Sequence, residues 1–262
     1  MTFNSLQFAG FFVAVLLLYY RFGVRGQNRL MLLAGSIFYA AFDWRFLGLL
    51  YLSIVVDFFV GRALDRTDDL RARRGLLATS LVVQLGILAV FKYFDFFADS
   101  LYQLLGRVGF GADPVTLHIV LPVGISFYTF QTLAYIFAVY RRQIDAEKNF
   151  WTFAAFVAWF PQLVAGPIER ATSLLPQIRL RRRAPDLPLS ESALFLILRG
   201  LFKKVVVADG VATVVNTVYA NPGGFGWSAL IVATVGFVVQ VYGDFSGYSD
   251  IARGTSRLLG VE

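Results

Sequence analysis

The hydrophobic positions of the chain run in long blocks, and several blocks contain no Asp, Glu, Lys or Arg. These uncharged blocks are Met1–Tyr20, Gly75–Phe91, Ile119–Tyr140 and residues 210–243. An α-helix needs about 20 apolar residues to cross the hydrocarbon of a bilayer. The turn sequence Asn-Pro-Gly-Gly at 221–224 divides the last block, so a spanning helix should begin near Trp227 and run to about Gly243.

Two blocks near the N-terminus are less regular. Leu30–Phe42 is short for a span, and Phe46–Gly61 is long enough but contains Asp57. Asp-Trp-Arg at 43–45 separates them and predicts a tight turn at the membrane surface, where Trp is favoured.

The block Asn149–Ile168 is long enough to cross a membrane, but Pro161 and Pro167 interrupt it. Proline removes a backbone donor and breaks a helix. Broken backbone at membrane depth is tolerated only where protein buries it or a cavity solvates it. The pattern therefore predicts a re-entrant segment, or a bent helix that lines a cavity.

The block Ser190–Asp209 begins apolar but carries Arg199, Lys203 and Lys204. Charged side chains within a span are costly. These three should therefore either extend to the interface or pair with acidic groups.

Composition agrees with a membrane protein. Of the 262 residues, 57% are hydrophobic and 16% are charged, and there is no cysteine. Ordinary soluble domains carry about a quarter charged residues. The net charge of +7 does not indicate a nucleic-acid partner, because the basic residues flank apolar blocks and do not line one face. The expected fold class is an all-α, polytopic transmembrane helical bundle with re-entrant or broken helices around a polar tunnel.

The basic clusters orient the predicted helices. With the N-terminus outside, most of the 24 Lys and Arg residues fall on the cytoplasmic side, as the positive-inside rule requires. The sequence is interpreted as one incomplete membrane domain. Its parts are N-terminal helices over 1–178, a basic cytoplasmic linker over 179–190 and the start of a catalytic half over 191–262.

Three segments combine polar residues with helix breakers. Residues 121–131 read LPVGISFYTFQ, which suits ordinary helix packing as well as a functional role. Residues 159–170 read WFPQLVAGPIER, and a turn at the interface would also use Pro and Gly. Residues 240–252 read QVYGDFSGYSDIA. Such dense polarity at a membrane boundary indicates a polar cavity or substrate path, although a solvated loop with Asx turns remains open.

His118 is the single histidine. A lone histidine beside a span is more often interfacial than catalytic, and without Cys or a second His a metal site of the usual kind is disfavoured.

The wording LPVGISFYTFQTLAY, then WFPQLVAGPIER, then YGDFSGYSDIARGTSRLLG resembles the bacterial membrane-bound O-acyltransferase family, in the branch of the alginate O-acetylation membrane protein. The D-alanyl transfer protein of teichoic acid modification is a more distant relative. Relatives commonly have Cys where this chain has Gly243. The family's catalytic histidine follows the DFSGYSD motif in a Trp- and Arg-rich segment, so it is expected beyond Glu262.

This resemblance implies an enzyme that moves an acyl group from a cytoplasmic thioester, acetyl-CoA or an acyl carrier, toward an extracytoplasmic polysaccharide hydroxyl. Acetyl is favoured over D-alanyl. The implied partners are the lipid bilayer of the bacterial inner membrane and an extracytoplasmic acyl-relay or polysaccharide-modifying protein. The candidates for tunnel lining are Pro161, Gln162, Gly166, Pro167, Gln240, Tyr242, Asp244, Ser246 and Tyr248.

Two other classes of protein remain open. A polytopic transporter or channel would also explain polar groups and broken helices, although the two similar halves common in transporters are not seen. A non-catalytic scaffold of an acylation complex would explain the missing histidine segment. The 262-residue chain alone is expected to be inactive.

Overall fold

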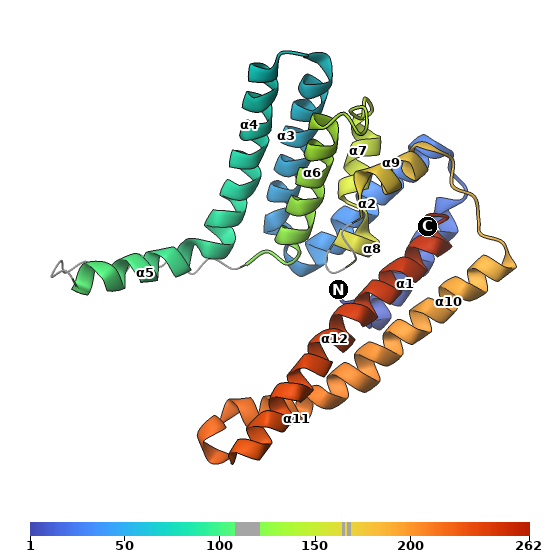
Figure 1. The fold of residues 1–262 in the computed structure, drawn as a ribbon. Helices are drawn as coiled ribbons and strands as arrows, with labels where there is room; N and C mark the ends of the chain where they lie inside the picture. The colour runs from blue at the N-terminus through green and yellow to red at the C-terminus, as the bar shows by residue number, and fades with distance from the viewer. Residues whose placement is uncertain (108–120, 164–165, 167–168) are drawn as a thin grey trace.

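Helices make up nearly the whole of the chain. The computed structural model describes residues 1–107, 121–163, 166 and 169–262, and within these ranges the chain forms helices and no strand. The prediction of an all-α fold is confirmed. Figure 1 shows a group of N-terminal helices and, beside it, a long helical hairpin formed by the C-terminal third of the chain.

The N-terminal group starts with helices joined by short connections. They are α1 (Leu6–Tyr19), α2 (Val24–Asp43), the 3-10 turn η1 (Trp44–Phe46), α3 (Leu47–Arg66) and α4 (Leu70–Leu88). Side chains cap two of these starts: the Ser5 hydroxyl accepts from the Phe8 amide at 3.1 Å, and the Asp69 carboxylate accepts from Ala72 at 3.0 Å. The interpretation of 30–42 as a short block was wrong about helix length, because α2 has 20 residues.

Helix α6 (Ile125–Tyr140) packs beside α3 and α4 (Figure 1). The three helices enclose Asp57, which is fully buried and accepts hydrogen bonds from Ser80 Oγ at 2.6 Å and Gln84 Nε2 at 2.9 Å. A buried carboxylate is tolerated only when its oxygens have donors. The acidic residue that the sequence places within a span is thus held by neutral side chains of the neighbouring helix.

Beyond α4 the helix continues through a π-helical turn, η2 (Ala89–Tyr93), into α5 (Phe94–Arg107). The helical stretch therefore extends past Lys92 and Asp95, beyond the uncharged block that ends at Phe91. In Figure 1, α5 runs away from the bundle at an angle to α4. Its apolar side chains, including Phe96 and Phe97, are exposed within this chain.

The predicted interruption of residues 149–168 is confirmed. The segment forms α7 (Phe150–Val157) and the one-turn α8 (Phe160–Leu163), and α9 (Ala171–Arg179) follows. The Asn149 side chain caps α7 by accepting from the Trp151 amide at 2.9 Å. Pro161 lies in α8, and Pro167 lies outside the described residues.

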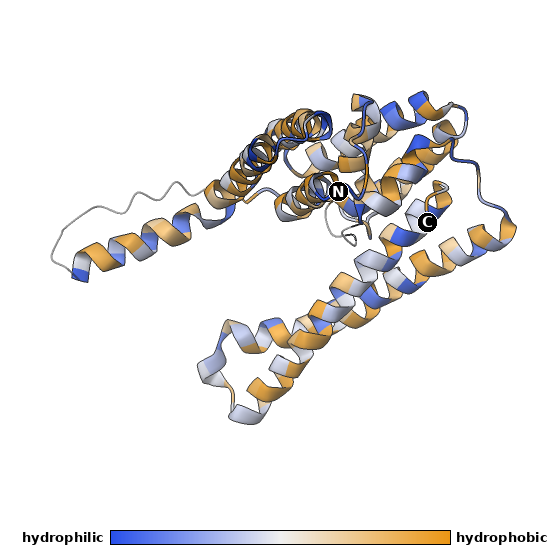
Figure 2. Ribbon diagram, turned by 45° about the horizontal axis from the view of Figure 1, so that its top comes forward, coloured by the Kyte–Doolittle hydropathy of each residue, from blue (hydrophilic) through white to orange (hydrophobic). Residues whose placement is uncertain are grey.

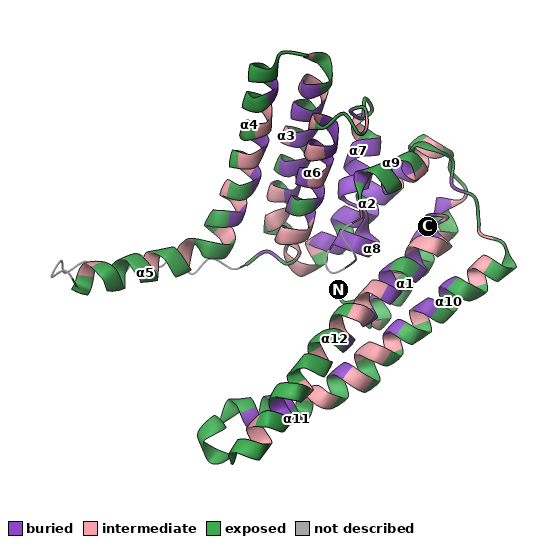
Figure 3. Ribbon diagram, in the orientation of Figure 1, coloured by how far each residue is buried: buried purple, intermediate pink, exposed green. Residues whose placement is uncertain are grey.

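Aromatic rings fill the centre of the N-terminal group. Phe3 packs on Phe8 and Phe38 with ring centroids 4.8 and 5.3 Å apart, and Phe38 lies 5.9 Å from Phe160. Buried residues are concentrated in α2, α7 and α8 (Figure 3). The broken backbone is therefore surrounded by protein, which is the condition for irregular structure at membrane depth.

The linker between the two parts is anchored by a buried arginine. Arg182 donates from Nε to the Tyr19 hydroxyl at 2.6 Å, from Nη2 to Asn28 Oδ1 at 2.7 Å and from Nη1 to the Ile178 carbonyl at 2.6 Å. Burial lowers the pKa of the Arg182 guanidinium. The basic composition of the linker suggests a solvated segment. The structure shows instead that one of its arginines, Arg182, lies inside the protein.

The C-terminal part is an antiparallel hairpin. It comprises α10 (Leu187–Leu201), the π-helical turn η3 (Phe202–Ala208), α11 (Asp209–Ala220), the 3-10 turn η4 (Pro222–Gly224) and α12 (Trp227–Leu258). The predicted start at Trp227 is confirmed. The predicted end near Gly243 is wrong, since the helix continues for 15 more residues. The YGDFSGYSD motif is therefore helical along its whole length and not a loop.

Within the residues that the structure describes, three continuous helical stretches are long and apolar enough to span a membrane: Val24–Arg66, Leu70–Arg107 and Trp227–Leu258. Leu6–Tyr19 and Ile125–Tyr140 are shorter apolar helices. In Figure 2 apolar positions dominate the helices, and polar ones gather at helix ends and connections. Only 11% of the apolar stretch of α12 is buried within the chain, so its remaining surface must face lipid or further protein. The chain is a membrane protein.

Candidate functional site

Helices α10 and α12 approach closely enough for their backbones to touch. A Cβ atom added at Gly247 would lie 2.8 Å from the Gly200 carbonyl oxygen, and one added at Gly254 would lie 2.6 Å from the Ala193 carbonyl. Small residues at such contacts are a general feature of packed membrane helices. The glycines of the motif therefore bring the two helices together and fix which side chains meet.

Replacing Gly247 by Ala should force α10 and α12 apart. Overpacking of this kind typically costs about 1–3 kcal/mol, and we expect the free energy of unfolding to fall by that amount. Thermal unfolding in detergent, followed by tryptophan fluorescence, would measure it. Gly210→Ala is the matched control, because a Cβ atom there meets nothing within 4 Å. Equal loss in both variants would contradict the close-contact interpretation.

Between the two helices lies a series of paired charges, which we call the charge ladder: Arg199, Lys203 and Lys204 on the α10 side, and Asp244, Ser246 and Asp250 on α12. Asp250 accepts from Arg199 Nη2 at 2.8 Å and from Lys203 Nζ at 2.7 Å. The same ammonium donates to Ser246 Oγ at 2.7 Å. The expectation that the basic residues of this block would extend to the interface or pair is resolved: they pair.

The second step of the charge ladder is formed by Lys204. Its ammonium contacts Asp244 at 2.6 Å and Asp209 at 2.7 Å, and it lies 5.7 Å from the ring centre of Tyr248. Both lysines belong to the π-helical turn η3. π-helical turns inside α-helices frequently occur at functional sites, and here the turn carries both ammonium groups that face the motif.

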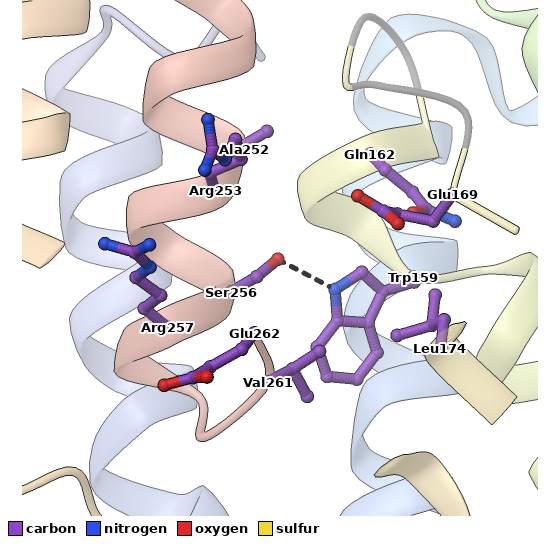
Figure 4. A pocket seen from close by; sticks show the side chains of 10 residues that line it. All are labelled: Trp159, Gln162, Glu169, Leu174, Ala252, Arg253, Ser256, Arg257, Val261 and Glu262. Carbon is purple, nitrogen blue, oxygen red and sulfur yellow. Dashed lines mark hydrogen bonds between the residues drawn. The ribbon is translucent and has the colours of Figure 1, made fainter. Parts of the chain in front are cut away.

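A pocket of about 70 Å³ lies between the broken segment and the end of α12 (Figure 4). Trp159 Nε1 donates to Ser256 Oγ across it at 3.0 Å. Gln162 is 6% exposed, and its side-chain nitrogen is buried without a hydrogen-bond partner among the described residues. The lining residues are Trp159, Gln162, Glu169, Leu174, Ala252, Arg253, Ser256, Arg257, Val261 and Glu262.

The described candidates for tunnel lining fall into two separate groups, with Tyr248 between them. Pro161, Gln162 and Gly166 are buried near the pocket, where Gly166 folds back against Gln162. Tyr248 is midway and packs on Phe3, with ring centroids 6.0 Å apart. The last group, Gln240, Tyr242, Asp244 and Ser246, lies further along α12 beside η3 and α11, and Tyr242 is 67% exposed. Pro167 lies outside the described residues.

Of the nine candidates, the pocket between the two motifs is lined by Gln162 alone. Consecutive helical residues rise about 1.5 Å, so Gln240 and Ser256 are about 24 Å apart along α12. The structure therefore does not bring the nine residues to one point. That they line a tunnel stays a prediction.

Several residues of the site were not selected from the sequence. Asp250 is the central acceptor of the charge ladder; its position four residues after Ser246 puts both on the same helix face, but it was not among the candidates for tunnel lining. Trp159, Glu169, Arg253, Ser256 and Arg257 line the pocket. No local signal in the sequence pairs residues 159–169 with 253–257, because that contact depends on tertiary packing.

The side chains of the charge ladder and of the pocket hold one another in place, and those that the structure describes do not form a metal centre. Across the described residues, no three or more His, Cys, Asp or Glu side chains gather where they could hold a metal ion. Asp244 and Asp250 are both engaged by cationic side chains. His118 lies outside the described residues. The charge ladder holds α10 against α12, and the pocket joins that hairpin to the broken segment.

No protein-family model matches the chain. A "Probable alginate O-acetylase" of Pseudomonas aeruginosa is 39% identical over 266 residues, covering 99% of this chain and 50% of the relative. A "Peptidoglycan O-acetyltransferase" of Helicobacter pylori is 30% identical over 260 residues, covering 88% of this chain and 48% of the relative. A "Teichoic acid D-alanyltransferase" of Lacticaseibacillus rhamnosus is 28% identical over 152 residues, covering 53% of this chain and 36% of the relative.

The chain spans about half the length of the curated relatives it matches. Alginate O-acetylases of several other bacteria match it at 36–40% identity over 99% of its length. The matched span includes the broken segment and the helices of the charge ladder, since 99% of the chain is covered. Over its whole length the chain is therefore similar to about half of each of these alginate O-acetylases, in agreement with the resemblance of its three motifs to the membrane-bound O-acyltransferase family.

Proposed function

We propose that this chain is part of a membrane O-acyltransferase that moves an acetyl group from a cytoplasmic thioester toward a polysaccharide hydroxyl outside the inner membrane. The observation that carries the proposal is the 39% identity to an alginate O-acetylase over 99% of the chain. The paired charges and the polar pocket among apolar helices support it, because polar groups at membrane depth generally mark a substrate path.

The reaction joins a hydroxyl oxygen to the thioester carbonyl carbon, breaks the carbon–sulfur bond and releases a thiol. A hydroxyl attacks poorly until a base within hydrogen-bond reach takes its proton. The family resemblance implies that a histidine takes this role. Within the chain, we propose that Gln162 and the polar residues of α12 line the route along which donor and acceptor meet.

Orientation follows from charge. With the N-terminus outside, the basic ends of α4, α6 and α12 lie in the cytoplasm, where the thioester is made. The acetyl group would then leave on the opposite side, to a polysaccharide or to an extracytoplasmic relay protein. This arrangement would let the acyl group cross while its charged carrier stays inside.

The test is transfer of labelled acetyl groups in membranes that contain the full-length protein. We expect label from an acetyl thioester to enter extracytoplasmic polysaccharide, and we expect no transfer in membranes that lack the protein. An Asp244→Ala variant that inserts normally should transfer more slowly. Absence of transfer with every acyl thioester tested would favour a transporter or a non-catalytic scaffold.

A further inference from the structure

A second pocket, of about 660 Å³, lies between the end of α6 and the start of α9. Its volume is within the range of about 300–1,000 Å³ that is usual for small-molecule sites. We call its apolar lining from α6 (Ala134, Phe137 and Ala138) the floor, and its polar lining (Arg141, Gln143, Arg170 and Thr172) the rim. The lining residues are Ala134, Phe137, Ala138, Arg141, Gln143, Arg170, Ala171 and Thr172.

Two guanidinium groups of the rim lack an acidic partner. Arg141 and Arg170 are exposed, no Asp or Glu lines the pocket, and neither arginine forms an ion pair within the described part of the chain. Their neighbours differ. Arg142 pairs with Asp68, and Arg179 pairs with Glu147 at 2.6 Å. The positive charge of this pocket is therefore left for something else to neutralise.

A strained turn places one of these arginines. Arg142 has a φ of 57°, in the left-handed region that non-glycine residues rarely adopt. The turn closes α6 with hydrogen bonds from the Arg142 amide to Val139 at 3.0 Å and from the Gln143 amide to Ala138 at 2.9 Å. Strain of this kind tends to occur at functional sites. Here it directs Arg142 toward Asp68, while Arg141 and Gln143 line the pocket.

The broken segment separates the two pockets. Glu169 lines the pocket against α12, and the next residue, Arg170, lines the pocket against α6. The acid–base pair that ends WFPQLVAGPIER is thus divided between two cavities. Glu169 lines the same pocket as Arg253 and Arg257. Arg170 lines the same pocket as Arg141.

We propose that the Arg141–Arg170 pocket binds the phosphate of a phosphorylated acyl donor, with the uncharged arm of the donor on the apolar floor; this rests on the proposed function. Guanidinium groups bind phosphate through paired, charge-assisted hydrogen bonds. Both arginines lie on the side that the charge bias places in the cytoplasm. A lipid headgroup has the same phosphate chemistry, so the experiment must separate the two sources.

Binding of tritiated acetyl-CoA should be measured on full-length protein in nanodiscs of phosphatidylcholine. The Arg141→Gln/Arg170→Gln variant is expected to bind at least about tenfold more weakly, because each lost hydrogen bond to a charged group is worth about 1.5–3 kcal/mol, equivalent to about tenfold or more. Arg25→Gln removes an exposed arginine outside the pocket and should change binding less than twofold. Acetyl-pantetheine, which carries the thioester without phosphate, should bind all three proteins equally.

Equal binding of acetyl-CoA by the double variant and the parent would overturn the proposal. So would a double variant that retains acetyl-CoA but loses phosphatidylglycerol in native mass spectrometry, because the phosphate would then belong to a lipid. The binding result is separate from the transfer assay. Phosphate-dependent binding without any acetyl transfer would support the pocket and contradict the proposed function. Acetyl transfer with equal donor affinity in the parent and the double variant would support the proposed function and contradict the pocket.

Discussion

Replacing Asp250 by Ala is expected to lower the free energy of unfolding of the protein by about 3 kcal/mol. The change leaves Arg199 and Lys203 facing each other without the carboxylate that now accepts from both. Removing one partner of a buried ion pair costs about 3–5 kcal/mol. We expect the lower end, because the Arg199 side chain is 43% exposed and water can solvate it. Thermal unfolding in detergent would measure the loss.

Asp244→Ala provides the matched control for Asp250→Ala. Its partner Lys204 keeps a second carboxylate, Asp209, at 2.7 Å, so the ammonium stays paired and the loss of stability should be only about 1 kcal/mol, similar to that of a surface pair. A triple change of Arg199, Lys203 and Asp250 to Leu should recover much of the stability, because apolar replacement of a whole buried pair is often neutral. A larger loss in Asp244→Ala than in Asp250→Ala would contradict the hierarchy within the charge ladder.

Arg182→Met is expected to cost about 3 kcal/mol or more. The change leaves the Tyr19 hydroxyl and the Asn28 side-chain oxygen, which now accept from the guanidinium, buried without that donor. Each unsatisfied buried polar group costs about 1–3 kcal/mol. Since the linker is fixed to α1 and α2 through this residue, limited proteolysis should also cut the linker faster in the variant.

Arg183→Met removes the neighbouring arginine, which is exposed. We expect no more than about 0.5 kcal/mol from that change, as for most surface substitutions. Arg182→Lys keeps the charge but cannot reproduce the three directions of the guanidinium, so its stability should fall between the parent and Arg182→Met. Similar losses from Arg182→Met and Arg183→Met would show that the buried contacts contribute little.

The helices of this protein could be predicted because a membrane-spanning helix requires a long uncharged block, which is easy to recognise in the sequence. Uncharged blocks mark spans, so α12 begins at the predicted Trp227, and Pro161 lies where the predicted break occurs. Both predictions depend only on local rules, namely the length of apolar sequence needed to cross hydrocarbon and the missing backbone donor of proline.

The sequence alone did not reveal which distant side chains contact one another. Arg182 belongs to a run of arginines that looks uniformly solvated, and only the positions of Tyr19 and Asn28 in the fold make it a buried anchor. The density of polar residues after Gly243 suggested a boundary, yet these residues are helical, and their carboxylates pair with basic side chains of α10 and η3. Local composition cannot report a partner that lies 40 or more residues away.

The candidate site was located only in part. Gln162 lines the pocket against α12, as its place in the broken segment suggested. Tyr242, another candidate for tunnel lining, is 67% exposed within this chain. Residue spacing shows which side chains share a face of a helix, but not whether that face packs inside the protein or is exposed.

The length of α12 connects the charge ladder to the thickness of the membrane. Its 32 residues measure about 48 Å at the helical rise of 1.5 Å, whereas the hydrocarbon core is about 30 Å thick. If Trp227 sits at one headgroup boundary, Asp244 lies about 26 Å along the helix and Asp250 about 35 Å, on either side of the opposite boundary. A thicker bilayer would draw Asp250 and its two cations into hydrocarbon, and a thinner one would hydrate Asp244. Hydrophobic mismatch would therefore set how tightly the two helices are held, so acyl-chain length in the host membrane becomes a determinant of the hairpin's stability.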